Sequence, residues 1–390
     1  MTIKTNKNKN KTVFVGMSGG VDSSVSAAIL KDQGYNVVGV FIKTWHPDFL
    51  VCNEEEERRD AMRNAAQLDI PFLTYDFEKE YKQGVADYMI SEYKLGRTPN
   101  PDVMCNREVK FGAFLNKALS MGADFVATGH YAINSSEIFS GPRGKSPDHS
   151  KISEEFNLKK GNDPSKDQSY FLWTLTQEQL SKILFPVGHL PKAEVRKLAK
   201  KFKLPVAEKK DSQGICFLGD VDIKEFLKHY IDSKNGKVLN EKGEEIGYHD
   251  GAVFHTLGER HGFTITEKTP NDGAYYVVAK DLKKNILVVS QNKSIHYFPN
   301  FALGDIGQGT HVSENSVFSL KDINWVSGLP IEGKKYDAQV RYHGEFLSCI
   351  LKNITKNKVE VVFDKEVLVA PGQSVVFYDE NTCLGGGVKM

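Results

Sequence analysis

A run of small residues between an apolar strand and a helical pattern has the composition of a phosphate-binding loop. The segment Ser18–Ser23 reads SGGVDS and follows the apolar residues Val13–Val15. Glycines let backbone N–H groups approach a phosphate without obstruction by Cβ, and a helix that starts there turns its positive end toward the ligand. Serine hydroxyls add donors, and Asp22 can cap the helix or hold a magnesium ion. We expect this segment to grip nucleotide phosphates, although a tight glycine turn would use the same residues.

The loop carries no lysine directly after its glycines. The Walker loop has a lysine there, and that lysine reaches the β- and γ-phosphates. A loop that grips pyrophosphate without this lysine suits cleavage between the α- and β-phosphates, in which AMP is transferred and pyrophosphate leaves. The sequence therefore indicates an adenylating use of ATP.

Two cysteines stand in segments that could activate a thiol. Cys105 follows two prolines at the expected start of a helix, with Arg107 and Lys110 close behind. A helix N-terminus and neighbouring cations favour the thiolate, which is the nucleophilic form. Taken alone, Cys105 is equally well explained as a small buried apolar residue. Cys216 lies between glycines in an expected loop, where functional residues are common.

Short apolar runs alternate with helical patterns over the first half of the chain. The runs expected as buried strands are Thr12–Gly16, Asn36–Ile42, Phe72–Tyr75 and Phe125–Thr128. The segments expected as helices are Asp22–Gln33, Glu54–Leu68 and Asn106–Met121. This alternation predicts an α/β domain with a doubly wound parallel sheet, whose ligands lie beyond the carboxyl ends of the strands.

Two later segments are charged or rich in turn residues. Residues Asn134–Ser153 hold Ser, Gly, Pro and charges, and we expect a mobile loop or insertion there. Leu190–Lys210 contains eight basic residues and two acids, with a helix expected at Leu190–Phe202. The cations expected on one face of that helix are Lys192, Arg196, Lys200 and Lys203. This density could grip a phosphate backbone, but a solvated helix face explains it equally well.

Beyond about Asp220, glycine becomes frequent and short alternating stretches replace the earlier pattern. These stretches are Tyr275–Ala279, Ile286–Ser290, Ala338–Tyr342, Val359–Phe363 and Ser374–Tyr378. They predict a small mixed or β-rich module followed by a closed β-barrel. Because 390 residues exceed one ordinary core, we expect three domains. They are a nucleotide-binding domain at residues 1–219, a small central domain at 220–290 and a C-terminal barrel at 291–390.

Composition and charge exclude several classes of protein. A net charge of +1 excludes a generally polycationic nucleic-acid binder, but not one that gathers its positive charge locally. No apolar run approaches the roughly 18 residues of a membrane span. The cysteines are Cys52, Cys105, Cys216, Cys349 and Cys383. Because they form no CxxC pair and have no histidines at zinc-ligand spacing, we expect no disulfide framework and no structural zinc, and scattered thiols suit a reducing cytoplasm.

Further motifs connect these separate signals. In chain order they are PNPDVMCN (99–106), TGHYA (128–132), KDQSYFL (166–172), FPVGHLPKAEVR (185–196), DSQGICFLG (211–219) and CLGGG (383–387). SGGVDSS is similar to the pyrophosphatase-type loop (PP-loop) of ATP-dependent adenylating enzymes. With the other motifs, the chain resembles the tRNA-specific 2-thiouridylase family over nearly its whole length.

The resemblance implies roles for particular residues. Cys216 would receive sulfur as a persulfide, Cys105 would act as the second catalytic thiol, and Asp102 would belong to the same catalytic group. The ATP site would comprise Gly16, Met17, Ser18, Gly19, Gly20, Val21, Asp22, Ser23, Ile42 and Gly129. The target uridine would contact Asn100, Pro101 and Asp102, and the tRNA would contact His130, Lys166, Asp167, Gln168, Arg341, Tyr342 and Gln373. Without the resemblance, His130 is more simply a structural histidine and Gln168 a surface amide.

The implied reaction is ATP-dependent 2-thiolation of the wobble uridine in the tRNAs for Lys, Glu and Gln. AMP would be transferred to the C2 oxygen with magnesium neutralising the phosphates, and the persulfide sulfur would then displace it. The sulfur donor would be a cysteine desulfurase or a relay protein. We hypothesise that Cys105 and Cys216, distant in sequence, also lie far apart in space until the Cys216 loop reorders over bound tRNA.

Three positions depart from the family pattern. Glu259 and His261 stand where the family usually has glutamine and lysine, and His343 stands where a second arginine is common. The acid puts a direct phosphate contact by the loop around Glu259 in doubt. The histidine could make tRNA affinity at the barrel sensitive to pH.

Two rival functions remain open from the residues alone. Another PP-loop ligase acting on a small metabolite would explain residues 12–24, but it gives no role to the two cysteines or the barrel. A non-catalytic RNA-binding protein would explain the barrel and the basic helix, but it leaves the nucleotide loop without a use.

Overall fold

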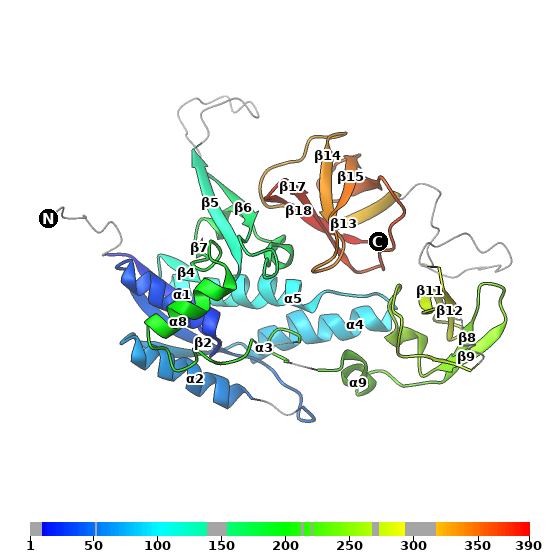
Figure 1. The fold of residues 1–390 in the computed structure, drawn as a ribbon, viewed down its shortest axis with the longest axis horizontal. Coiled ribbons are helices and arrows are strands. Elements are labelled where there is room, and N and C mark those ends of the chain that lie inside the picture. Colours follow the sequence, from blue (N-terminus) through cyan, green and yellow to red (C-terminus); the bar gives the residue numbers. More distant parts are fainter. Residues whose placement is uncertain are drawn as a thin grey trace.

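The structure is a computed structural model that describes residues 10–50, 53–138, 154–211, 214–219, 221–266, 273–292 and 317–390. Within these ranges the chain forms a parallel α/β domain, a small mixed sheet and a closed antiparallel barrel (Figure 1). The fold class expected from the sequence is confirmed in all three parts. No helix in the described ranges has both the length and the apolar character needed to cross a membrane.

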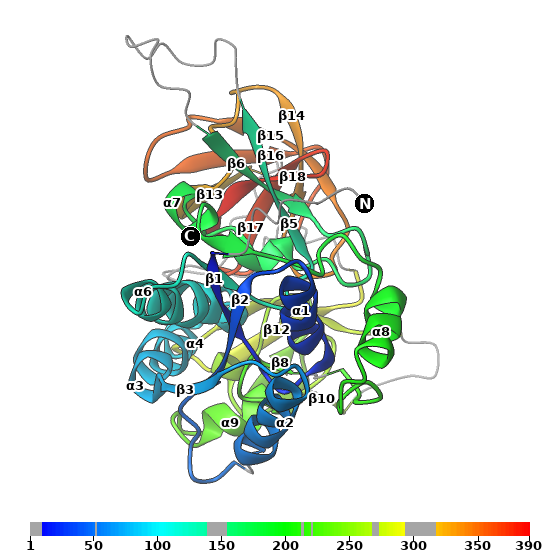
Figure 2. The same cartoon turned by 90° about the vertical axis from the view of Figure 1, so that its left-hand side faces the viewer.

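Parallel strands form the centre of the N-terminal domain, in the order β3-β2-β1-β4-β7. Their bounds are β1 Thr12–Gly16, β2 Asn36–Lys43, β3 Phe72–Asp76, β4 Phe125–Ala127 and β7 Ile183–Leu184. Successive side chains of a strand point to opposite faces, so Phe14 joins one buried cluster while Val13 and Val15 join the other. Both faces are therefore covered by helices, with α1 and α8 on one side and α4 and α6 on the other (Figure 2).

The helices of this half confirm the expected positions, with one shifted start. They are α1 Val21–Asp32, α2 Glu54–Gln67, α3 Glu78–Tyr81, α4 Tyr88–Lys94, α5 Pro101–Met104, α6 Leu115–Ser120, α7 Gln177–Leu180, α8 Lys192–Lys201 and α9 Ile223–Lys228. π-Helical turns at Lys82–Asp87 and Cys105–Phe114 join α3 to α4 and α5 to α6, and a 3-10 turn lies at Ser169–Leu172.

The helix expected from Asn106 begins five residues earlier, at Pro101. Asn100 caps it by accepting a hydrogen bond from the Val103 N–H at 3.2 Å, and proline at the first helical position needs no N–H partner. Cys105 therefore lies inside the helix and is buried, not at an exposed helix start.

A hairpin replaces the first part of the expected insertion. β5 (Ala132–Ile138) pairs antiparallel with β6 (Glu154–Lys160), so the expected loop is wrong as far as Ile138; residues 139–153 lie outside the described ranges. The polar Asn134 concealed this strand, because its side-chain amide donates to the Leu180 and Ile183 carbonyls at 2.7 and 2.9 Å. β6 continues into the barrel sheet through a pairing of Lys159 with Thr382.

The central sheet has the order β10-β9-β8-β12-β11, with β8 and β12 parallel and its other neighbours antiparallel. Its strands are β8 Gly236–Leu239, β9 Glu245–His249, β10 Thr264–Ile265, β11 Tyr276–Asp281 and β12 Ile286–Ser290, with a 3-10 turn at Ala252–Phe254.

The C-terminal strands run β13-β16-β15-β14-β17-β18, and pairing of β13 with β18 closes the barrel. Their bounds are β13 Val317–Trp325, β14 Lys335–Gln339, β15 Leu347–Lys352, β16 Val359–Phe363, β17 Ser374–Asp379 and β18 Thr382–Lys389. The CLGGG motif lies in β18, where a Cβ on Gly385 would stand 2.0 Å from the Asn324 carbonyl oxygen and one on Gly386 would stand 2.5 Å from that of Val375. The motif therefore serves barrel closure.

Candidate active site

One large cavity joins the nucleotide loop to a cysteine. Its volume is about 1090 Å³, and its wall includes the loop after β1, the residues that follow β4, the turn that carries Cys216, and Tyr342 and His343 of the barrel. Ligand pockets commonly measure about 300–1,000 Å³, so the space suffices for a nucleotide together with a base. The PP-loop and the thiol chemistry therefore share one chamber.

The nucleotide loop is shaped to receive an anion. Gly20 occupies the N-cap of α1 without a side-chain cap hydrogen bond, so the N–H groups of the first turn remain available to a ligand. Gly19 has φ +72°, and a Cβ there would lie 2.3 Å from the Glu57 carbonyl oxygen, so the turn requires glycine. A Cβ on Gly129 would lie 2.7 Å from the Ser23 nitrogen, which would obstruct the same turn. This uncapped, open cradle fits the phosphates of ATP.

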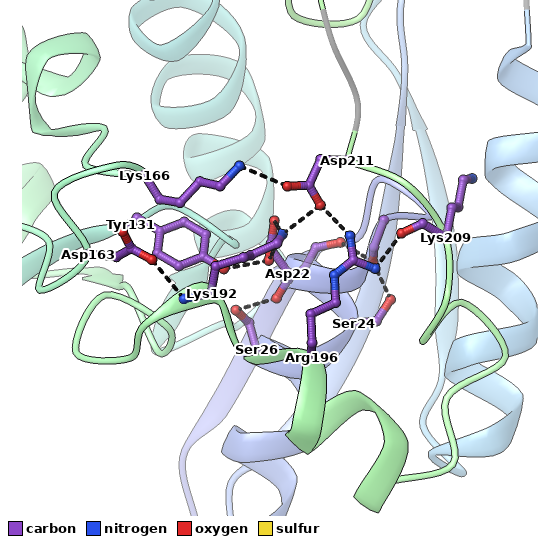
Figure 3. A network of polar contacts seen from close by, with 12 residues as sticks. Asp22, Ser24, Ser26, Tyr131, Asp163, Lys166, Lys192, Arg196, Lys209 and Asp211 are labelled. Carbon is purple, nitrogen blue, oxygen red and sulfur yellow. Dashed lines mark hydrogen bonds and ion pairs between the residues drawn. The ribbon is translucent and has the colours of Figure 1, made fainter. Parts of the chain in front are cut away.

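Asp22, on the first turn of α1, accepts hydrogen bonds from two other segments (Figure 3). Its Oδ1 accepts from the Tyr131 hydroxyl at 2.7 Å, and the Lys192 ammonium lies 2.6 and 2.7 Å from its two oxygens. Lys192 also lies 3.0 Å from Asp211 Oδ1, which Arg196 contacts at 2.5 Å. Asp22 does not cap its helix; it anchors a cation.

The cations expected on one face of α8 have different partners in the structure. Val195 and Ala199 pack in the same buried cluster as Val25 of α1. That packing sets Lys192 against Asp22 of the nucleotide loop, whereas Arg196 pairs with Asp211. Lys200, farther along the helix, stays exposed and pairs with Glu208, as a solvated face would.

The sulfur atoms of Cys105 and Cys216 lie 3.3 Å apart, and the Cys105 thiol donates toward Cys216. The hypothesis that these thiols are distant before tRNA binds is therefore wrong for this structure. A separation of 111 positions in sequence placed no limit on their distance in space. Cys105 is buried beneath the cavity wall, whereas Cys216 forms part of that wall.

A tight turn holds Cys216 over the helix that carries Cys105. Ile215 and Gly219 exchange both backbone hydrogen bonds, at 2.9 and 2.8 Å. The Cys216 N–H donates to Asp102 Oδ1 at 2.9 Å, and the Tyr81 hydroxyl donates to the Cys216 carbonyl at 2.8 Å. Asp102, expected at the target base, thus positions the sulfur-bearing turn.

The two thiols differ in acidity. Burial, with the hydrogen bond to Cys216, raises the pKa of the Cys105 thiol well above its usual range. The hydrogen bond from Cys105 lowers the pKa of Cys216, and the nearby Lys110 ammonium lowers it further. Cys216 is therefore the more acidic thiol of the pair.

Lys110→Met is expected to slow alkylation of Cys216 by iodoacetamide at pH 7 by about tenfold. Removing the ammonium raises the pKa of Cys216 because the thiolate loses a neighbouring positive charge. Mass spectrometry of the Cys216 peptide as a function of pH measures the shift. Lys117→Met, at an exposed position on α6, which continues from the π-helical turn, is the matched control. An unchanged alkylation profile in the Lys110 variant would show that another group stabilises the thiolate.

Several residues expected at the nucleotide or tRNA site do line the cavity. They are Gly16, Met17, Ser18, Gly20, Val21, Asp22, Ser23, Ile42, Gly129, His130, Lys166, Gln168, Asp102, Cys216 and Tyr342. His130 Nδ1 lies 2.7 Å from the Thr128 hydroxyl oxygen, and burial, with Lys110 nearby, lowers the pKa of His130 well below its usual range. A neutral histidine here can accept or donate a hydrogen bond without adding charge.

Other expected contacts lie away from this cavity. Asn100 lines a separate space of about 170 Å³ between α5 and the barrel. Asp167 is turned inward, where its Oδ1 accepts from the Gly161 and Ser169 N–H groups at 2.9 and 3.0 Å. Gln373 accepts from the Ala370 N–H at 2.8 Å, and Arg341 is exposed on the barrel. In this structure, the side chains of Asp167 and Gln373 form hydrogen bonds that stabilise the turns in which they lie.

The Glu259 side chain also makes its contacts within its own turn. Its Oε2 accepts from the Thr256 N–H at 2.9 Å and lies 3.5 Å from His255 Nδ1, while His261 Nδ1 lies 3.6 Å from its other oxygen. The acid at this position therefore organises its own turn.

Residue types alone did not reveal three members of the site: Tyr131, Lys192 and Asp211. Tyr131 is buried behind Asp22, and the two charged residues belong to a segment dense in charge. Only their position at the start of α8 and just before the Cys216 turn distinguishes Lys192 and Asp211.

Comparison with known proteins identifies the family. Residues 11–220 match the family described as tRNA methyl transferase HUP domain, 224–291 its PRC-barrel domain, and 315–388 the aminomethyltransferase beta-barrel domain. The chain is 44% identical to the tRNA-specific 2-thiouridylase MnmA of Geobacillus thermodenitrificans over 387 residues, covering 98% of this chain and 95% of that protein. The chain belongs to the tRNA-specific 2-thiouridylase family. The 2-thiouridylase of Streptococcus thermophilus is 42% identical over the same shares of both chains.

The domain descriptions mention methyl transfer, whereas these full-length relatives are thiouridylases. The full-length match decides between them, because it extends over both cysteine segments and all three domains. Among solved structures, the U34-tRNA thiolase NcsA from Methanococcus maripaludis has a TM-score of 0.33 at 17% identity, covering 67% of this chain and 79% of that one. That likeness is too weak to carry an argument.

Proposed function

We propose that this chain replaces the C2 oxygen of the wobble uridine of tRNA with sulfur, using ATP to activate the oxygen. The observation that carries the proposal is the shared cavity, in which an uncapped PP-loop and Cys216 line the same space, with the buried Cys105 sulfur 3.3 Å from that of Cys216. A small-metabolite ligase would need no such thiol pair, and a passive RNA-binding protein would need no phosphate cradle.

The first step forms a better leaving group. The C2 oxygen of uridine attacks the α-phosphorus of ATP, pyrophosphate departs, and AMP becomes bonded to that oxygen. The loop N–H groups hold the phosphates, and Asp22 would contribute to holding Mg²⁺, which would neutralise part of their charge when bound.

The second step transfers sulfur. A persulfide donor passes its outer sulfur to the Cys216 thiolate and leaves as a thiol. The outer sulfur of the Cys216 persulfide attacks C2, and AMP departs with the former C2 oxygen. The Cys105 thiol then loses its proton, and the resulting thiolate attacks Cys216 Sγ. This forms the Cys105–Cys216 disulfide and leaves the outer sulfur on C2. A dithiol reductant must return two electrons to the disulfide before the next turnover.

The remaining assignments follow the family resemblance. We expect the tRNAs for Lys, Glu and Gln as substrates, a cysteine desulfurase or relay protein as sulfur donor, and a reducing cytoplasm as the compartment. Asn100, Pro101, Asp167, Arg341 and Gln373 would contact tRNA only if bound tRNA reaches beyond the cavity described above. Domain limits at residues 219 and 290 stay a proposal.

The test is a reconstitution with purified chain, ATP, a persulfide donor and an unmodified tRNA transcript. Nucleoside mass spectrometry should detect 2-thiouridine, with one AMP and one pyrophosphate released per sulfur inserted. A transcript with cytidine at the wobble position should support neither product. Thiolation without ATP, or equal AMP release with the cytidine transcript, would overturn the proposal.

A further inference from the structure

The PP-loop lacks the lysine that the Walker loop carries, yet the ammonium of Lys192 lies at the first turn of the following helix. Lys192 places Nζ 2.6 Å from Asp22 Oδ1, although the two residues are 170 positions apart. We propose that Lys192 is the phosphate-binding lysine of this site, contacting the β- and γ-phosphates of ATP and the departing pyrophosphate. The inference rests on the proposed use of ATP, and it assigns a residue to that use.

The fold delivers this ammonium by packing α8 beside α1. Val195 and Ala199 pack in the cluster that also buries Val25. The Lys192 N–H donates to Asp163 Oδ2 at 2.9 Å, which fixes the first residue of α8 (Figure 3). The backbone is therefore anchored, while the side chain extends to the loop and forms part of the cavity wall.

If Lys192 turns toward a ligand, its carboxylate partners Asp22 and Asp211 each keep another hydrogen-bond donor. Asp22 keeps the Tyr131 hydroxyl at 2.7 Å. Asp211 keeps Lys166 at 2.9 Å and Arg196 at 2.5 Å. The Lys192 side chain is 13% exposed and carries its charge on a flexible four-carbon stem, so a short rotation turns it toward a ligand in the cavity.

The charges of the cluster favour such a move. Asp22, Asp163 and Asp211 are balanced by Lys166, Lys192 and Arg196. A triphosphate adds negative charge to a balanced group, and its oxygens attract a cation more strongly than a carboxylate already shared with another donor. AMP, which lacks the β- and γ-phosphates, offers this lysine no equivalent contact.

The experiment measures binding of ATP, pyrophosphate and AMP to the full chain by calorimetry, without tRNA. Lys192→Met keeps the length of the side chain and removes its charge. We expect the dissociation constants for ATP and pyrophosphate to rise about tenfold to a hundredfold, the range for losing a charged hydrogen bond. The constant for AMP should change by less than about twofold. Lys192→Arg should retain part of the affinity for ATP.

The matched control is Lys197→Met on the same helix, whose side chain is 72% exposed and pairs with Glu194. It should bind all three ligands as the native chain does. Unchanged ATP binding by Lys192→Met, or an equal loss for ATP and AMP, would overturn the inference.

Lysine footprinting of the native chain covers the case in which Lys192→Met does not fold. Acetic anhydride should modify Lys192 less when ATP or pyrophosphate is bound, and AMP should give no protection; equal modification throughout would overturn the inference. A native chain that binds ATP but thiolates no tRNA would refute only the proposed function.

Discussion

Cys216→Ser is expected to lower the rate of 2-thiouridine formation by about four orders of magnitude or more, the scale seen when an enzyme nucleophile is removed. A serine oxygen cannot accept the outer sulfur of a persulfide donor, so no sulfur reaches the cavity. ATP binding should persist, because the PP-loop lies on a different part of the wall. Nucleoside mass spectrometry and calorimetry on the same preparation measure the two effects.

Cys105→Ser should stop the reaction at a different point. Cys216 can still be loaded and can still attack C2, but its sulfur then stays bonded to the transferred sulfur. We expect a covalent tRNA adduct at Cys216 that dithiothreitol releases. Cys349→Ala, which alters a buried barrel thiol, is the control and should keep full activity. If the Cys216→Ser variant still formed 2-thiouridine, Cys216 would not be the residue that carries the sulfur.

The second large expected effect is loss of thiolation when the two thiols are oxidised. Diamide, which takes two hydrogen atoms from a pair of thiols, should close the Cys105–Cys216 disulfide without tRNA and abolish more than about 90% of thiolation. The reason is proximity, because sulfur atoms 3.3 Å apart need little movement to bond and one of them is already favoured as the thiolate. Dithiothreitol should restore activity. Peptide mass spectrometry of the oxidised chain identifies the linked pair.

Cys105→Ser serves as the control for this reaction, since it should give no intramolecular cross-link at Cys216. If the native chain fails to cross-link until tRNA is added, the close pair would belong to the tRNA-bound state alone.

The fold class and the position of the glycine loop between strand and helix could be predicted because they are local. The β1 strand, the glycine loop and α1 are consecutive in sequence, so apolar runs and helical spacing suffice to place them. Ser18–Ser23 and Gly129 then meet because the carboxyl ends of neighbouring parallel strands meet.

The parts that sequence reasoning missed depend on side chains from distant segments. Whether Lys192 faces solvent or Asp22 is decided by how α8 packs on α1, and a row of lysines looks the same in either case. The β5 strand was missed because the Asn134 side chain donates to the Leu180 and Ile183 carbonyls, so a half-buried strand position carries a polar residue. The distance between the thiols depends on the contacts of Asp102 and Tyr81 with the Cys216 turn, which neither cysteine motif reveals.

The last strand of the chain completes the first domain. β18 pairs with β6 at Thr382, and a Cβ on Gly386 would lie 3.3 Å from the Trp173 ring. Asn324 of the barrel donates to the Trp173 carbonyl at 2.7 Å. During synthesis these surfaces stay uncovered until β18 has left the ribosome. A prematurely terminated chain would therefore display an unpaired strand edge and an uncovered tryptophan, features that mark it for chaperones and proteases before it can consume ATP.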